Sequence, residues 1–251
     1  MSGHSHWATI RRKKGATDAK RGQVFTRLAR EIVIAAREGG GDPSSNMRLA
    51  LAVEKARAQN MPKDNIERAI KRGTGDLKEG NALEEVAYEG YAPHGVALVM
   101  DVVTDNRNRA VAEIRHVLNR LGGSMAEAGS VAWQFTRRAY FTFPAEGQDN
   151  DAIFELAVEA GADDVKFTED TIEIIAPIES FKDISDSLRR AGITPDDAEL
   201  RPLPNNEVEL GMDDTLQIIR LVDALEELDD VQAVYSTLSI SDEVMAHLEA
   251  A

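Results

Sequence analysis

Lysine and arginine residues are concentrated at the N-terminal end of the chain, and their charges are suited to binding an anion. Residues 1–30 hold eight cations against one acidic residue. The cations are Arg11, Arg12, Lys13, Lys14, Lys20, Arg21, Arg27 and Arg30. A cation that neutralises a phosphate releases a counterion, so this run predicts a nucleic-acid-binding arm, and Trp7 just before it can stack on a base. The alternative is a solvated basic tail or a lipid contact.

A second candidate is the stretch Thr104-Asp105-Asn106-Arg107-Asn108-Arg109, which follows an apolar segment and opens an expected helix. Its two arginines, Arg107 and Arg109, fall in the first turn, where free backbone N–H groups and a partial positive charge favour an anion. Cations at that end oppose the helix dipole, which hints at a bound phosphate. The alternative is a helix capped by Asp105 with exposed first-turn side chains.

The other reactive residue types lack catalytic or metal-binding spacing. The chain has no cysteine, and its five histidines form no His-Glu-x-x-His pattern. A Gly-x-Ser-x-Gly nucleophile motif is absent. Adjacent acids at 163–164, 213–214 and 229–230 are interpreted as caps or solvated charges. We therefore predict no enzymatic activity, no metal and no cofactor.

Charge is divided unevenly along the 251 residues, which carry a net charge of −15. Residues 139–203 hold five basic and sixteen acidic residues, and residues 204–251 hold one and twelve. This asymmetry predicts a polyanion-binding end and an acidic end that is solvated or binds a protein partner. No apolar run approaches the ~20 residues of a membrane span, so we expect no membrane contact. The lack of a secretory signal and of cysteine predicts a cytoplasmic protein. We also expect a monomer.

The elements that must position these residues follow from the apolar periodicity. Residues 1–21 show no amphipathic period and are expected to be extended or disordered. A helix is predicted over 23–37, ended by the glycines at 39–41, then a second helix capped by Ser45 and a third with Pro62 in its first turn. Strands are predicted at 86–91, 96–103 and 131–136, with a helix between the last two.

Residues 139–203 show a complete strand-helix-strand-strand-helix-strand series, the ferredoxin-like order. A strand at 207–210, a helix and a strand at 231–235 follow this series, and they complete the unfinished α/β segment that precedes it. We therefore predict an α+β fold with three domains, two of them ferredoxin-like sandwiches, one inserted in the other. The domains are a basic arm with a three-helix domain at 1–80, a discontinuous domain at 81–138 with 204–251, and the inserted domain at 139–203.

Several blocks resemble the YebC/PmpR family from end to end. They include GHSHW (3–7), GGGDP (39–43), NMPKDNIERAI (60–70), YEGYAPHGVA (88–97), TDNRNR (104–109) and GSVAWQF (129–135). The resemblance implies a three-domain fold of one helical and two α/β domains, one of them discontinuous. It also implies a cytoplasmic, DNA-binding regulator of transcription. The related mitochondrial translational activator of cytochrome oxidase implies a second role, on the ribosome.

Three functions are consistent with these observations. The first is a DNA-binding transcriptional regulator. The second is a ribosome-associated translation factor whose arm contacts ribosomal RNA, and the absence of an evident helix-turn-helix recognition helix favours backbone or RNA contacts. The third is an acidic protein-interaction module with an incidental basic tail.

Overall fold

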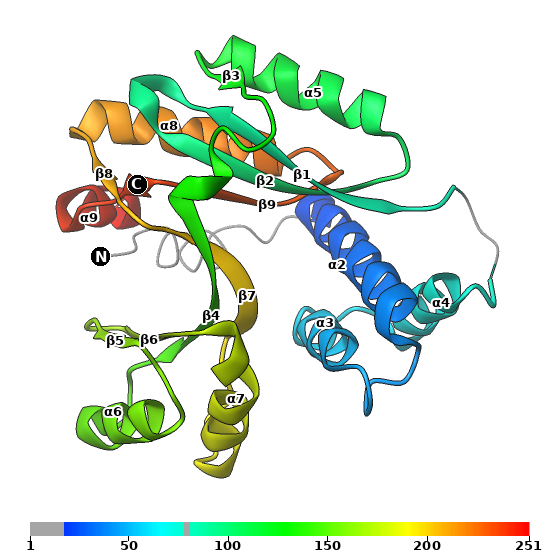
Figure 1. Cartoon of the computed structure of the whole chain (residues 1–251), viewed down its shortest axis with the longest axis vertical. Helices are drawn as coiled ribbons and strands as arrows, with labels where there is room; N and C mark the ends of the chain where they lie inside the picture. Colours follow the sequence, from blue (N-terminus) through cyan, green and yellow to red (C-terminus); the bar gives the residue numbers. More distant parts are fainter. Residues whose placement is uncertain (1–17, 78–80, 251) are drawn as a thin grey trace. The chain divides into compact units, whose positions relative to one another are not determined.

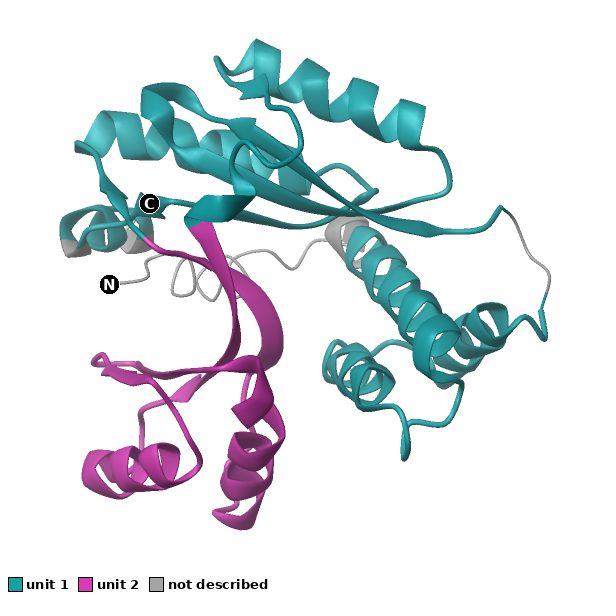
Figure 2. Ribbon diagram, in the orientation of Figure 1, with its two compact units in different colours: residues 1–134, 206–251 teal, residues 135–205 magenta. Residues whose placement is uncertain are grey.

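The computed structural model describes residues 18–77 and 81–250 (Figure 1). The chain divides into two compact units, residues 1–134 with 206–251 and residues 135–205 (Figure 2). The second unit is one continuous segment inserted between the two parts of the first. The further division of the first unit into a helical and a discontinuous α/β domain stays a prediction. The α+β fold class with an N-terminal helical region is confirmed.

Three helices form the N-terminal region: α2 (Asp18–Gly39), α3 (Met47–Ala58) and α4 (Lys63–Thr74). Their apolar faces share one core, which includes Ile32, Leu49 and Ile66 and extends to Val103. Helices α2 and α4 approach closely at Gly73, where an added Cβ would lie 2.5 Å from the Val33 carbonyl oxygen. A small residue is therefore required at that crossing.

The starts of the helices differ from the predicted ones. Helix α2 begins at Asp18, so the prediction of an extended segment over 1–21 is wrong for its last four residues, and the remaining seventeen lie outside the described residues. The segment DAKR contains good helix formers, which explains the earlier start. Asn46, not Ser45, caps α3: its Oδ1 accepts from Leu49 N, while the Ser45 hydroxyl donates to the Asp42 carbonyl.

The first unit also contains a four-stranded antiparallel sheet in the order β3-β1-β2-β9. The strands are β1 (Glu84–Tyr91), β2 (Ala97–Thr104), β3 (Ser124–Met125) and β9 (Val231–Ser236). A short 3-10 turn, η1 (Pro93–Gly95), joins the first two. Helices α5 (Arg107–Arg120) and α8 (Met212–Glu226) cover one face of the sheet (Figure 1). This is the ferredoxin-like strand order with one change of connectivity, because β1 precedes rather than follows β2, α5 and β3.

Two expectations about this unit are corrected, and one further element is found. Residues 132–134 form the 3-10 turn η2 (Ala132–Gln134) instead of a strand, because the N–H groups of Val131 and Ala132 donate to the carboxylate of Glu89. The strand predicted at 207–210 is shortened to β8 (Val208–Glu209), which pairs in parallel with β10 (Leu238–Ser239) in a separate sheet. A C-terminal helix, α9 (Asp242–Ala250), was not predicted.

The second unit has the full ferredoxin-like order, with antiparallel strands arranged β5-β6-β4-β7. Its elements are β4 (Phe135–Pro144), α6 (Asn150–Glu159), β5 (Asp164–Phe167), β6 (Thr171–Ala176), η3 (Ile178–Ser180), α7 (Phe181–Arg190) and β7 (Asp197–Pro204). Alternation along β4 and β6 places Phe141 and Ile174 beneath the helices. Phe141 stacks on Phe181 with ring centroids 4.9 Å apart, which seats α7 on the sheet.

Candidate nucleic-acid interface

The predicted nucleic-acid-binding residues fall into three groups in the structure. Trp7, Arg11, Arg12, Lys13 and Lys14 lie outside the described residues. Lys20 and Arg21 belong to the first turn of α2, followed on the same helix by Arg27 and Arg30, while Arg107 and Arg109 lie in the first turn of α5. The fold brings Arg30 and Arg109 together, although they are far apart in sequence.

Arg30 and Arg109 meet at the carboxylate of Asp230, whose side chain is only 3% exposed. Arg30 Nη1 lies 2.8 Å from Oδ1 and Arg109 Nη2 lies 2.8 Å from Oδ2, while the Thr104 hydroxyl donates to Oδ2 at 2.8 Å. Burial would raise the pKa of Asp230. The hydrogen bonds from Arg109 and Thr104, with the charge of Arg30, outweigh that effect and hold the pKa below its usual value. The carboxylate is therefore ionised and both arginines are engaged within the protein.

Side chains of α2 also bind the C-terminal end of α8. Arg27 donates to the Glu226 carbonyl, Arg30 to the Asp229 carbonyl, and Gln23 Nε2 to the Glu227 carbonyl at 3.4 Å. The last carbonyls of a helix lack intrahelical partners and carry a partial negative charge, so cations stabilise them. Arg27 and Arg30, predicted as phosphate ligands, thus act in this structure as caps that join α2 to the α/β part of the unit.

The first turn of α5 is also occupied by contacts within the protein. Arg107 Nε lies 2.5 Å from Glu84 Oε2, and Arg109 also contacts Asp105 Oδ1 at 2.9 Å. The cap is Asn106, whose Oδ1 accepts from Arg109 N at 3.1 Å, so the expectation of Asp105 as the cap is wrong. Both members of the Arg107 pair are more than half exposed, so that pair is weak and phosphate can compete for Arg107. A phosphate contact by Arg107 and Arg109 stays a prediction.

Three cations missed by the sequence reasoning are exposed on the helical region. Arg57 on α3, and Arg68 and Lys71 on α4, make no side-chain hydrogen bond or ion pair with any residue in 18–77 or 81–250. Arg68 and Lys71 are three residues apart, on the side of α4 opposite the buried Ile66 and Ala69. Helical spacing alone would have identified them.

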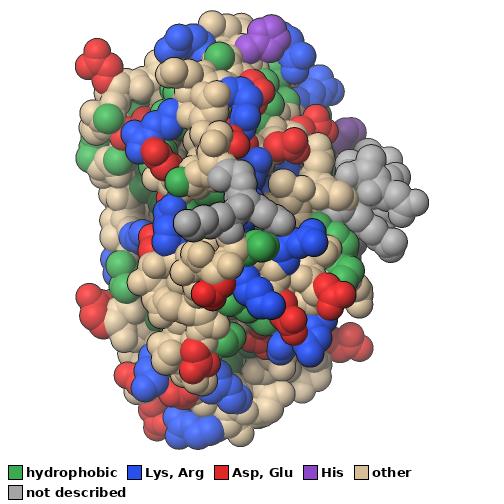
Figure 3. Space-filling view, turned by 90° about the vertical axis from the view of Figure 1, so that its right-hand side faces the viewer, with side chains coloured by type: hydrophobic (Ala, Val, Ile, Leu, Met, Phe, Trp, Pro, Cys, Tyr) green, Lys and Arg blue, Asp and Glu red, His purple; other side chains and the backbone are tan. Residues whose placement is uncertain are grey.

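Helices α3 and α4 are joined by a turn of four residues, Gln59 to Pro62, with Asn60 in the left-handed region at φ 59°. Two helices joined by so short a turn are typical of helix-turn-helix units. On the side of the chain shown in Figure 3, lysine and arginine side chains are interspersed with acidic ones. This part of the chain therefore offers a helix edge with cations, but not a uniformly basic surface.

An exposed aromatic side chain was also missed. Trp133 was expected on a strand but lies in η2 with 70% of its surface exposed, and its Nε1 donates to the Ser130 carbonyl at 2.9 Å. The turn before it is held by the buried carboxylate of Glu89, which accepts the N–H groups of Gly129, Val131 and Ala132. Burial opposes ionisation of Glu89, but these three bonds lower its pKa below the usual value. The indole is presented on a fixed turn.

The described part of the chain offers little for other chemistry. A polar cleft of about 550 Å³ lies over the Asp230 cluster, lined by side chains that include Gln23, Arg109 and Glu113. Within residues 18–77 and 81–250, no three His, Asp or Glu side chains gather as metal ligands would. The same residues include no helix long and apolar enough to cross a membrane. That the protein is not an enzyme stays a prediction.

Comparison with known proteins gives matches over nearly the whole chain. Residues 5–76 match the model described as the TACO1/YebC protein N-terminal domain, and residues 83–238 match the TACO1/YebC second and third domain. A relative from Acidithiobacillus ferrooxidans, named probable transcriptional regulatory protein, is 52% identical over 100% of this chain and 99% of its own. A relative of the same name from Nitrosococcus oceani is 51% identical over 99% and 100%.

A solved structure shows the same fold. The crystal structure of a conserved hypothetical protein from Aquifex aeolicus superposes with a TM-score of 0.86 at 42% identity, covering 96% of this chain and 99% of that one. The matched domains, the full-length relatives and this structure agree with the resemblance found in the sequence motifs. The chain belongs to the TACO1/YebC family.

Proposed function

We propose that this protein is a cytoplasmic nucleic-acid-binding regulator of gene expression, and specifically a DNA-binding regulator of transcription. The names of its relatives support a regulatory role. The observation that carries the proposal is the division of cations into two groups. Arg27, Arg30 and Arg109 are engaged with acceptors in the protein, whereas Arg57, Arg68 and Lys71 are exposed and free of such contacts in the described structure.

In this proposal α4 lies against the DNA and the N-terminal arm adds phosphate contacts. Arg68 and Lys71 face outward from α4, and Asn65, also exposed, offers an amide that can read a base edge. Asp64 and Glu67 on the same helix repel phosphate, and this repulsion limits how deeply α4 enters a groove of the DNA. The arm cations Arg11, Arg12, Lys13 and Lys14 then supply most of the affinity, and it is not specific for sequence.

The alternative is a ribosome-associated translation factor, and one observation favours it. Trp133 presents its indole on a fixed turn, and an exposed indole stacks on unpaired bases. Folded RNA offers such bases in loops and bulges, whereas duplex DNA keeps them stacked. The cations on α3 and α4 serve equally well against an RNA backbone.

The salt dependence of binding tests the proposed contacts. Binding of the whole protein to a fluorescent 30-base-pair duplex is measured by anisotropy over a range of salt concentrations. If five arm cations meet phosphates, they contribute roughly −3.5 to −4.5 to the slope of log affinity against log salt, and the three cations on α3 and α4 add about −2 to it. Neutralising Arg11, Arg12, Lys13 and Lys14 flattens that slope by about three, and the triple variant R57A/R68A/K71A flattens it by about two.

The matched control is the triple variant R115A/R120A/R220A, which removes three exposed cations from α5 and α8 and changes the net charge equally. It should leave the slope within about half a unit of the wild-type value. If the control flattens the slope as much as the α3–α4 variant, net charge rather than this surface governs binding, and the proposed interface is wrong.

A second measurement separates DNA from the ribosome. Promoter occupancy in cells, lost in the R57A/R68A/K71A variant, supports transcriptional regulation. Co-sedimentation with ribosomes that survives moderate salt and DNase, and is lost in Trp133→Ala, supports the translation factor instead.

A further inference from the structure

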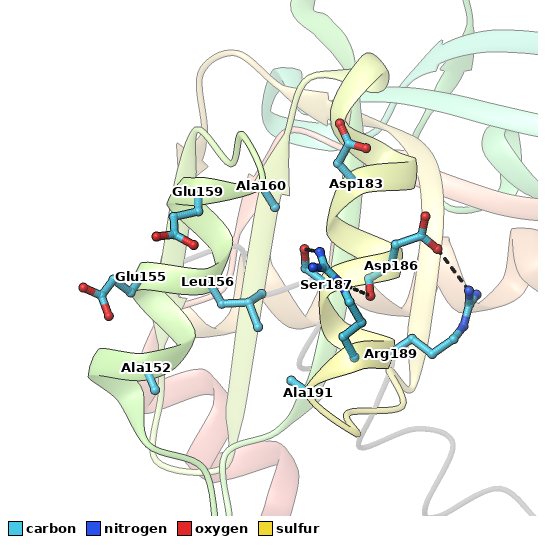
Figure 4. A pocket seen from close by; sticks show the side chains of 11 residues that line it. Ala152, Glu155, Leu156, Glu159, Ala160, Asp183, Asp186, Ser187, Arg189 and Ala191 are labelled. Carbon is cyan, nitrogen blue, oxygen red and sulfur yellow. Dashed lines mark hydrogen bonds and ion pairs between the residues drawn. The ribbon is translucent and has the colours of Figure 1, made fainter.

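The second unit has a long groove between its two helices, which faces away from the sheet (Figure 4). The groove is open to solvent, has a volume of about 1060 Å³ and is lined by residues of α6, of α7 and of the positions that follow these helices. Small side chains explain its presence, because Ala152, Ala160 and Ala191 occupy positions where larger residues would fill the gap. Leu156 projects into the space and provides an apolar floor (Figure 4).

Carboxylates border this groove on both helices, and those of Glu155 and Glu159 point away from α7 (Figure 4). Glu155 and Glu159 lie one turn apart on α6, and Asp183 and Asp186 lie on α7 (Figure 4). Like charges spaced by four residues destabilise a helix, and α6 carries no basic residue to offset them. Arg189 pairs with Asp186 at 3.0 Å, and Arg190 also lines the groove and donates to the Ser187 hydroxyl at 2.8 Å. The four carboxylates and two arginines therefore leave the groove with a net negative charge. Folding alone does not favour such an arrangement.

The solvent-facing surface of α6 also carries apolar side chains. Phe154 and Val158, one turn apart, are 52% and 51% exposed. Helical spacing places them on the other side of the acidic row from Leu156, so apolar and acidic strips alternate around the outside of the helix. An exposed apolar strip on a helix of a soluble domain marks a surface that binds another molecule.

We propose that this groove and the outer face of α6 bind a lysine- and arginine-rich polypeptide segment of a protein partner. Charge complementarity selects this occupant. The unit as a whole, residues 135–205, has seven basic and sixteen acidic residues, so its field repels nucleic acid and attracts cationic chains. Long basic side chains reach the two rows of carboxylates, and an apolar residue between them contacts Leu156. The inference does not rest on the proposed function, because it concerns a different surface and a different class of ligand.

The test uses the whole protein and a defined probe, a twelve-residue peptide of lysines with leucine at every third position. Binding is followed by NMR of the backbone amides and quantified by isothermal titration calorimetry. The expected shift changes are confined to α6 and α7. The variant E155Q/E159Q/D183N/D186N should weaken binding about tenfold, because four exposed charge pairs are lost.

The matched control is E146Q/D164N/E169Q/D170N, which removes two exposed glutamates and two exposed aspartates elsewhere in the same unit. It should change the affinity less than about threefold, since only long-range attraction is reduced. A peptide with serine in place of leucine should bind the wild-type protein more weakly if Leu156 is contacted. Equal weakening by the two variants, or shift changes spread over α8 and α9, would mean non-specific polycation binding and would overturn the inference. The groove variant should bind duplex DNA as the wild type does.

Discussion

Removing the carboxylate of Asp230 should loosen the attachment of α2 to the sheet of its unit. In Asp230→Ala, Arg30 and Arg109 lose their shared partner and the Thr104 hydroxyl loses its acceptor. Breaking a buried ion pair costs about 3–5 kcal/mol when the remaining charge stays dry. Arg30 is 17% exposed and Arg109 is 43% exposed, so both regain some water. We therefore expect a loss of about 2–4 kcal/mol, or roughly 5–15 °C in the melting temperature of this unit.

Thermal unfolding and amide hydrogen exchange measure this effect together. Exchange should accelerate in α2 and in the α8–β9 turn, while α6 and α7 in the other unit stay unchanged. The control is Asp229→Ala, because the neighbouring side chain is exposed and only its backbone carbonyl binds Arg30. If Asp230→Ala melts within about 1 °C of the wild type and exchange in α2 is unaltered, the cluster does not hold the helix and the reasoning fails.

The Asp230 cluster also predicts the direction in which the stability of the folded protein changes with pH. The pKa of Asp230 is lower in the folded protein than its unfolded value of about 3.9, so its stabilisation is present above that pH. The contribution is lost as the pH falls through the folded-state pKa. The difference in stability between the wild type and Asp230→Asn should therefore be constant near neutral pH and shrink below about pH 4.

Three other substitutions probe single contacts. Glu89→Ala leaves the N–H groups of Gly129, Val131 and Ala132 without an acceptor and should cost about 2–3 kcal/mol, with faster exchange at those amides. Asn46→Ala removes the cap of α3 and the bonds from Nδ2 to the carbonyls of Ala35 and Gly40, and should cost about 2–3 kcal/mol in urea unfolding. Gly73→Ala should cost about 1–3 kcal/mol in the same assay, because its Cβ would lie 2.5 Å from the Val33 carbonyl oxygen and 2.7 Å from Ala36 Cβ. For each of the three variants, an unchanged unfolding midpoint would contradict the contact assigned to that residue.

The spacing of apolar residues and the positions of turn-forming residues were enough to predict most elements of the fold. The inserted strand-helix-strand-strand-helix-strand series is complete in one continuous segment, so its strand order followed from a known motif. The first unit was harder, because β1 precedes the elements it lies between and β9 returns after the insertion. Short pieces without a period, such as β3 and the 3-10 turn at Ala132–Gln134, depend on tertiary contacts. The alternation Val131, Trp133, Phe135 is typical of a strand, but the Glu89 carboxylate binds that backbone instead.

The site was less predictable than the fold, and the arginines show why. Arg30 and Arg68 have the same charge and both lie on amphipathic helices, so composition treats them alike. Arg30 meets Asp230, two hundred residues later in the chain, whereas Arg68 meets solvent. Only the folded chain decides which cation is neutralised. The adjacent acids at 229–230, interpreted from sequence as caps or solvated charges, include the carboxylate that engages two of the predicted phosphate ligands.

This neutralisation also sharpens the expected orientation of a bound polyanion. With Arg27, Arg30 and Arg109 engaged, the helical region of the first unit still exposes Arg57, Arg68 and Lys71 on α3 and α4. The C-terminal segment 204–251 of the same unit has one basic and twelve acidic residues. A phosphate backbone is therefore attracted to one edge of the unit and repelled from another, so the field favours one docking orientation before any contact forms. Because the engaged arginines also hold α2 in place, the free cations project from a fixed helix bundle and lose little side-chain and backbone freedom on binding.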